Sequence, residues 1–344
     1  MTRIWATGDT VPGRRLLVAL EEHTITPAIA AAWQDLEEGN SASYLDQPVL
    51  GAIRDRLLEL GEQRLRDMDD QGVDVQVLSI TTPGVQNLDG VRAVPLARQA
   101  NDLLADVVAG RPHRFEAFAT LPTTDPRAAA DELRRAVSEL GLKGAMLHGR
   151  TGDMHLDDPA LEPMWQAAAE LRCPISLHPQ IPRPAVLDAY YSGLDPTFDT
   201  IFGSPLIGWH YDTGVELLRL IFAGVLDRHP DIQLIANHWG EVVLFYADRI
   251  AMVDNLGTPL ARPFQDYLRD NVSYTGSGIM SQRYLRWTKE IVGIERILYA
   301  SDYPYIDTGQ GRGRAFIDDN PDLTDDERDA ISHGNWHRLT AHLH

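Results

Sequence analysis

Cysteine is nearly absent from this sequence, which has only Cys173 among its 344 residues. Cys173 therefore has no partner for a disulfide within the chain. A chain of this length buries most of the surface that it would expose when unfolded, so it does not need disulfides for stability. We expect a protein of the reducing cytoplasm.

Long apolar runs and an excess of basic residues are also missing. No apolar run approaches the roughly 20 residues that cross a bilayer, and the N-terminus reaches Asp9 before any apolar segment of the kind found in signal peptides. Lys and Arg number 31 against 50 Asp and Glu, which gives a formal net charge of −19. An acidic surface repels phosphate backbones and anionic lipids, so we expect neither nucleic acid nor a membrane as partner.

Internal repeats and low-complexity tracts are absent too, and eight short apolar runs stand out instead. Each is rich in β-branched or aromatic residues, as is typical of parallel strands buried on both faces. The runs are residues 16–20, 73–80, 115–121, 143–147, 174–177, 232–236, 272–275 and 297–300. Most are followed by a helical pattern, and this alternation predicts an α/β fold, a (β/α)8 TIM barrel. An open doubly wound sheet is the alternative.

The helical patterns and the longer connections predict a single domain. The clearest helical stretches are residues 126–140, 159–171, 214–227 and 281–292. We expect an N-terminal arm over residues 1–14 and the barrel over residues 15–344. Two connections are longer than a barrel needs: residues 24–71, with an extra helical segment after the first strand, and the aromatic-rich loop 180–212 after the fifth. Long connections of this kind are commonly lids or binding loops.

Acidic and imidazole side chains gather directly after several of the predicted strands. They are Glu21, Glu22, His23, His148, His178, His238, Glu241 and Asp302. The carboxyl ends of all barrel strands converge at one mouth, where catalytic groups collect. Glu21 and His23 lie two residues apart, so they point to one side of a strand and Glu22 to the other. Glu21 and His23, together with His178 and Asp302, form a mixed nitrogen and oxygen set suited to zinc, manganese or iron, with one coordination position left open.

Each of these residues also has an ordinary structural interpretation. A histidine at a strand end is most often a hydrogen-bonded structural residue, Glu21 could be an ion-pair partner, and Asp302 could cap a turn. The metal-site interpretation depends on their coincidence at successive strand ends. Other histidines are interpreted as surface or packing residues, namely His113, His155, His229, His333, His337, His342 and His344. His210 differs from these only because it lies in the long loop.

Several motifs occur in an order and spacing that cover nearly the whole chain from residue 16 to residue 343. They are Ala-Leu-Glu-Glu-His at 19–23, Leu-x-x-x-Gly-Val-x-Asp-Arg-His-Pro at 220–230, His-x-Gly-Glu at 238–241, Ser-Asp-Tyr-Pro at 301–304 and Gly-Asn-x-x-Arg-Leu at 334–339. This set resembles the amidohydrolase superfamily, specifically its metal-dependent decarboxylases. That branch includes γ-resorcylate, 2,3-dihydroxybenzoate, 5-carboxyvanillate and aminocarboxymuconate semialdehyde decarboxylases.

The resemblance implies a metal-dependent carboxy-lyase that decarboxylates a small hydroxyaromatic or related unsaturated acid without oxidation. It implies one Mn²⁺ or Zn²⁺ held by Glu21, His23, His178 and Asp302, and a homodimer or homotetramer. The implied catalytic residues are His238, as the group that handles protons or carboxylate, and Glu241, as the acid that orients it. Asp302, beside the ion, is our candidate for the proton donor. The candidates for substrate binding are Arg249, His148, Phe202, Trp209, Tyr211 and Tyr303.

Two departures from the decarboxylase pattern bear on the substrate. His148 stands at the end of the fourth strand, where the phenolic-acid decarboxylases tend to show asparagine, and Asn237 replaces a small residue before His238. A hydrolase or hydratase that uses metal-bound hydroxide is the alternative activity, and a barrel that binds without turnover is the remaining class. The Glu-x-His opening and the aromatic segment 208–213 favour decarboxylation.

Overall fold

The computed structural model describes residues 14–34, 36 and 51–343 of the chain. Apart from Arg14, the predicted N-terminal arm lies outside the described residues, as does part of the first long connection. Within the described residues, no helix is long and apolar enough to cross a membrane.

All strand pairing is parallel, and neighbouring strands follow one another in the sequence. The strands are β1 (Val18–Thr24), β2 (Val75–Ile80), β3 (Phe115–Ala117), β4 (Ala145–His148), β5 (Ile175–His178), β6 (Leu234–Ala236), β7 (Val272–Thr275) and β8 (Ile297–Leu298). They form a three-stranded sheet, β1-β2-β3, and a five-stranded sheet, β4-β5-β6-β7-β8. Single parallel bridges join the edges of the two sheets, Ala119 with Ala145 and Leu20 with Ala300. The predicted alternation of parallel strands is confirmed, whereas the ladder is not continuous through all eight.

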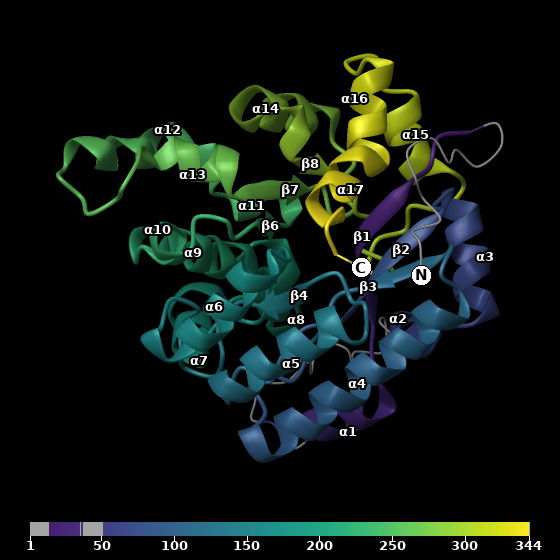
Figure 1. Ribbon diagram of the computed structural model, residues 1–344, viewed down its shortest axis with the longest axis horizontal. Helices are drawn as coiled ribbons and strands as arrows, with labels where there is room; N and C mark the ends of the chain where they lie inside the picture. The colour runs from purple at the N-terminus through teal and green to yellow at the C-terminus, as the bar shows by residue number, and fades with distance from the viewer. Residues whose placement is uncertain (1–13, 35, 37–50, 344) are drawn as a thin grey trace.

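Helices follow the strands and lie outside them (Figure 1). The longer ones are α4 (Gly90–Gly110), α5 (Pro126–Ser138), α6 (Glu162–Leu171), α9 (Gly208–Phe222) and α14 (Gln282–Val292), and the shorter ones are α10 (Val225–Arg228), α12 (Ala247–Ile250), α13 (Phe264–Asp270), α15 (Arg312–Asp318), α16 (Asp325–Asp329) and α17 (Asn335–Thr340). α5 shows how the sequence determines where a helix begins and which face it buries. Asp125 caps its first turn by accepting a hydrogen bond from the Ala128 amide, and its apolar stripe, which includes Leu133, is buried.

The first strand begins and ends later than the sequence predicted. The prediction placed it at residues 16–20 with Glu21 and His23 after its end, and this was wrong because β1 continues to Thr24. The pairing register with β2 shifts between Ala19 and Glu22, and Glu21 has a φ of 63°. Glu21 and His23 therefore sit inside a strand with an irregular ladder, which still leaves Glu22 on the opposite side from them.

The two long connections contain helical structure. Between β1 and β2 lie α1 (Pro27–Trp33), α2 (Gly51–Leu58) and α3 (Glu62–Gln71). After β5 come α7 (Pro184–Val186), η4 (Leu187–Tyr191), α8 (Pro196–Ile201) and η5 (Phe202–Leu206). The description of residues 180–212 as a loop was therefore wrong, because α9 begins at Gly208 and carries Trp209 and Tyr211 in its first turn. After this segment, α9 packs against α11 (His238–Glu241), which follows β6.

Candidate metal centre

Four predicted ligand residues meet at the carboxyl ends of β1, β5 and β8. Glu21, His23, His178 and Asp302 each offer one ligand atom, and these four atoms all lie within 4.8 Å of one another. Nε2 of His23 lies 3.9 Å from Oε1 of Glu21 and 3.5 Å from Oδ1 of Asp302. Nε2 of His178 lies 3.3 Å from Oε1 of Glu21. Two ligands at about 2.1 Å from one ion are at most about 4.2 Å apart, so the three distances of 3.9, 3.5 and 3.3 Å suit a single ion.

Two of these ligand atoms are buried and have no hydrogen-bond partner, namely Oε1 of Glu21 and Nε2 of His23. A buried polar atom without a partner costs free energy, and a metal ion is one of the few groups that would satisfy both atoms. Burial, together with the neighbouring His178 and His148 imidazoles, holds the pKa of His23 well below its usual value. Neutral imidazole is the form that binds metals. The residues present therefore fit one divalent metal ion.

In Glu21, His23 and His178, the polar atom that does not face the cluster is held from behind. Nδ1 of His178 donates to the carbonyl of Pro179 at 2.7 Å, and Nδ1 of His23 lies 3.3 Å from Oγ of Ser79. The hydroxyl of Ser277 donates to Oε2 of Glu21. Partners of this kind fix the ring orientation and leave each Nε2 directed at the cluster.

Glu22 ties the first strand to the loop that carries Asp302. Its carboxylate accepts hydrogen bonds from the backbone amide of Ser301 at 2.9 Å and from the Ser301 hydroxyl at 2.7 Å. Gln76 also donates to Glu22, and Arg64 binds both Gln76 and the carbonyl of His23. Burial raises the pKa of Glu22 to about 7, against the opposing effect of the Ser301 hydrogen bonds. This buried network fixes Glu22 and Ser301, which are the chain neighbours of the candidate ligands Glu21, His23 and Asp302.

Asp302 combines burial with backbone strain. Its φ of 59° lies in the left-handed region, which is uncommon outside glycine and typical of functional sites. Burial raises its pKa well above the usual value, and the nearby Glu21 carboxylate adds to the effect. A carboxyl group in this position is suited to carry a proton.

His238 and Glu241 form a close pair beside the cluster. Nδ1 of His238 lies 2.7 Å from Oε1 of Glu241, and its Nε2 lies 3.5 Å from Oε1 of Glu21. Every residue from His238 to Val242 has a positive φ, and this tight turn folds Glu241 back onto the imidazole. Burial opposes a charge on His238, but Glu241 and Glu21 outweigh it and raise its pKa to about 10.

His210, which was not among the predicted site residues, lies against this pair in the structure. Nδ1 of His210 lies 2.7 Å from Oε2 of Glu241, so the carboxylate bridges two imidazoles. The three side chains also form a set with metal-ligand spacing. Only its place in the long connection after β5 set His210 apart in the sequence, and that position did not reveal its contact.

Of the predicted substrate-binding residues, two lie beside the metal cluster. Nδ1 of His148 is 3.4 Å from Nδ1 of His178, and His148 is buried. The Trp209 ring lies edge-on to the His178 ring, with 6.4 Å between their centroids. His148 therefore backs a ligand, whereas Trp209 is placed to form one wall of a site.

The other four candidates make their contacts elsewhere in the described residues. Phe202 packs against Phe198 and Tyr191. Tyr303 lies under the Arg64 guanidinium and donates its hydroxyl to Asp67 at 2.8 Å. Tyr211 is 45% exposed, and Arg249 is exposed on α12 with Met252 as a neighbour.

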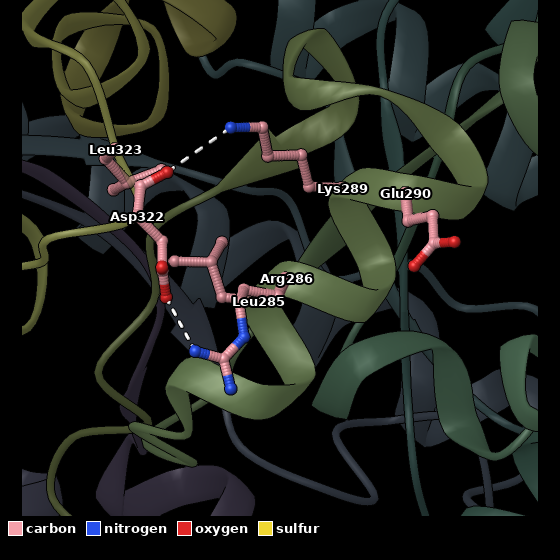
Figure 2. A pocket seen from close by; sticks show the side chains of 6 residues that line it. All are labelled: Leu285, Arg286, Lys289, Glu290, Asp322 and Leu323. Atoms are coloured by element: carbon pink, nitrogen blue, oxygen red, sulfur yellow. Dashed lines mark hydrogen bonds and ion pairs between the residues drawn. The ribbon is translucent and has the colours of Figure 1, made fainter.

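A hollow of about 370 Å³ lies beside α14, away from the cluster, and none of the cluster residues lines it. Figure 2 shows Arg286 bonded to the Asp322 carboxylate at 2.8 Å and Lys289 to the Asp322 carbonyl at 3.4 Å, whereas Glu290 points away from both. Lys289 also forms an ion pair with Glu327, so both cations of this hollow already have partners. The cluster around Glu21 is the better candidate site.

Comparison with known proteins places these observations in a family. A family model described as amidohydrolase matches residues 27–339. The γ-resorcylate decarboxylase of Rhizobium sp. is 35% identical over 306 residues, which cover 84% of this chain and 88% of that enzyme.

Two solved structures have the same fold over nearly their full length. One is a 2,6-dihydroxybenzoate decarboxylase complexed with 2,6-dihydroxybenzoate, with a TM-score of 0.83, 31% identity, and coverage of 95% of this chain and 100% of that one. The other is the 5-carboxyvanillate decarboxylase of Novosphingobium aromaticivorans, complexed with manganese and 4-hydroxy-3-methoxy-5-nitrobenzoic acid. Its TM-score is 0.87 at 29% identity, and the match covers 95% of this chain and 96% of that one.

Proposed function

The chain belongs to the amidohydrolase family, and we propose that it is a metal-dependent decarboxylase that removes CO2 from a small hydroxyaromatic acid without oxidation. The observation that carries the proposal is the cluster of Glu21, His23, His178 and Asp302, with two unpartnered buried ligand atoms beside the His238–Glu241 pair. The similar enzymes are decarboxylases, which favours this activity over the hydrolase alternative.

The reaction exchanges a carboxylate for a proton on one ring carbon. Mn²⁺ or Zn²⁺, held by Glu21, His23, His178 and Asp302, would supply positive charge for the substrate carboxylate and its ortho hydroxyl. The carboxyl group of Asp302 would deliver its proton to the ring carbon, the bond from that carbon to the carboxylate would break, and CO2 would leave as aromaticity returns. Protonated His238 would stabilise negative charge on the substrate, while Glu241 holds its Nδ1. Trp209 would form one wall of the slot for the ring.

We also propose that the two sheets form one barrel over residues 15–344, with residues 1–14 as an arm and inserted segments after the first and fifth strands. Buried side chains from both sheets support this, because they pack into one cluster. It includes Val18, Val77, Met146, Ile235 and Leu298. We further propose a homodimer or homotetramer, in keeping with the exposed apolar side chains of Phe245, Met252 and Leu256. The mass in solution, measured by light scattering, tests that proposal.

The test of activity is CO2 release from a panel of ortho-hydroxybenzoates by the protein loaded with Mn²⁺ or Zn²⁺. We expect release that a chelator abolishes, and a loss of about 100-fold or more in Asp302→Asn, which cannot carry the proton. The exposed Asp231→Asn is the matched control and should keep full activity. Bound metal without CO2 release from any acid would overturn the proposed activity and leave the metal site standing.

A further inference from the structure

Glu241 is a buried carboxylate with both oxygens committed. Oε1 pairs with Nδ1 of His238 and Oε2 with Nδ1 of His210, each at 2.7 Å, and only 1% of the Glu241 side chain is exposed. The two imidazole rings lie 4.6 Å apart at 63°. Only one of these bonds faces the metal cluster, so the bond from His210 needs a different explanation.

Neighbouring groups set the orientation of the His210 ring. Nε1 of Trp209 donates to Nε2 of His210 at 3.1 Å. Nε2 also lies 3.2 Å from the carbonyl oxygen of Pro205. The Glu241 carboxylate can only accept a hydrogen bond, so the Nδ1 that faces it carries a proton. His210 therefore acts as a donor with a fixed direction.

The backbone of α9 is shaped to bring His210 this close. His210 and Gly214 are four residues apart and lie on one face of the helix. A Cβ at Gly214 would lie 2.3 Å from the carbonyl oxygen of Glu241, so only glycine allows α9 to approach the turn at 238–242 so closely. Thr213 adds a bond from its hydroxyl to the Trp209 carbonyl at 2.8 Å, which steadies the first turn.

Removing the bond from His210 would leave Oε2 of Glu241 buried without a partner. Burial raises the pKa of Glu241, but the attraction of His238 and His210 outweighs it and keeps the pKa below its usual value. A carboxylate that lost one of its two donors could rotate or take up a proton, and either change weakens its hold on His238.

We propose that His210 is a positioning residue for the decarboxylation: it fixes Glu241 from behind, so that Glu241 holds His238 with Nε2 toward the metal cluster. This inference rests on the proposed function for its kinetic consequence. The geometry that it describes can be tested separately.

The test compares two substitutions at His210 with two at a matched histidine. His210→Leu removes the donor, and His210→Asn keeps an amide donor near the position of Nδ1. His229 is the control because it is also 13% exposed and bonds to a glutamate, Glu162, at 2.6 Å, but it lies outside the site. We would measure kcat, KM, metal content and melting temperature of His210→Leu, His210→Asn, His229→Leu and His229→Asn.

We expect His210→Leu to lose about 10- to 100-fold in kcat with KM and metal content unchanged, and His210→Asn to recover most of that loss. The His229 variants should keep the wild-type kcat. An unchanged kcat in His210→Leu would overturn the inference. An equal loss in both His210 variants would also overturn it, because packing rather than the donor would then be responsible.

A second readout does not depend on turnover. In the protein loaded with Zn²⁺, which is diamagnetic, the proton on Nδ1 of His238 should give a downfield NMR signal because it is bonded to Glu241. We expect that signal to move in His210→Leu and to stay in place in His210→Asn. If the wild type decarboxylates no acid in the panel, the proposed function fails, and an unmoved signal in His210→Leu would separately overturn the role of His210.

Discussion

At the scale of single residues, the charge on Glu241 determines how firmly His238 holds its proton. Burial alone would lower the pKa of His238, and Glu241 is the largest opposing influence that raises it. Glu241→Gln keeps an oxygen near Nδ1 and removes the charge, so the pKa of His238 should fall. If protonated His238 is the active form, activity falls as the pH rises through the pKa of His238. In the variant this fall should occur at a lower pH than in the wild type.

The measurement for this prediction is the pH dependence of kcat for the wild type and Glu241→Gln. Glu216→Gln is the matched control, because Glu216 is also a buried glutamate that holds an imidazole, that of His155. The high-pH limb should shift toward lower pH in Glu241→Gln alone. A limb that stays in place would show that His238 is not the group that titrates.

The sequence predicted the meeting of the four candidate ligands better than it predicted the residues around them. Glu21, His23, His178 and Asp302 could be found because each follows or ends an apolar run, and the ends of parallel strands converge. His210 could not be found in this way, because its contact with Glu241 joins residues 31 positions apart through a helix start that the sequence did not reveal.

Tyr303 shows a second limit of sequence analysis at this scale. It follows Asp302 directly and was expected to line the substrate slot, but its ring lies under Arg64 and its hydroxyl bonds to Asp67. Asp302 has a φ of 59°, so the backbone is not extended there, and the alternation of side chains along a strand could not predict where Tyr303 points.

At the scale of elements, the contact between α9 and the turn at 238–242 should be sensitive to a single methyl group. In Gly214→Ala the new Cβ would meet a backbone oxygen, which cannot rotate away, so α9 would have to move. We expect a loss of about 1–3 kcal/mol in the free energy of unfolding and a lower kcat, because His210 would move with the helix.

Denaturant unfolding and kcat check this prediction together. Gly110→Ala is the control, since a Cβ there meets nothing within 4 Å and Gly110 ends α4. It should leave kcat unchanged and the free energy of unfolding equal or slightly higher. A Gly214→Ala variant as stable and active as the wild type would show that α9 can shift without cost.

Element boundaries were predicted less well than element order, for a physical reason. Apolar content marks burial, but a strand also needs a hydrogen-bonded neighbour. Tyr299 and Ala300 are buried as expected, yet β8 ends at Leu298. Ala119 likewise continues the predicted third strand but is joined to Ala145 only by an isolated bridge. The end of a strand depends on hydrogen-bonded neighbours that lie far along the chain. A local apolar pattern contains no information on those neighbours.

At the scale of the whole molecule, the cluster of candidate metal ligands draws its residues from both sheets. Glu21 and His23 come from β1 in the three-stranded sheet, whereas His178 comes from the five-stranded sheet and Asp302 follows its last strand. The bridge between Leu20 and Ala300 lies next to both carboxylates. An ion bound by all four residues would therefore hold together two sheets that otherwise meet through single bridges and packed side chains.

This arrangement predicts that the metal stabilises the fold as well as serving the reaction. Without a cation, burial and the nearby Glu21 carboxylate raise the pKa of Asp302, and Oε1 of Glu21 has no hydrogen-bond partner. A ligand that binds only the folded state adds about 2.7 kcal/mol when its concentration is 100 times Kd. We expect added Mn²⁺ or Zn²⁺ to raise the free energy of unfolding by about that amount over the chelator-treated protein. His23→Ala should lose this gain and His229→Asn should keep it. The metal-loaded and the chelator-treated protein must differ in measured metal content. If their unfolding curves are nevertheless equal, the ion does not couple the sheets.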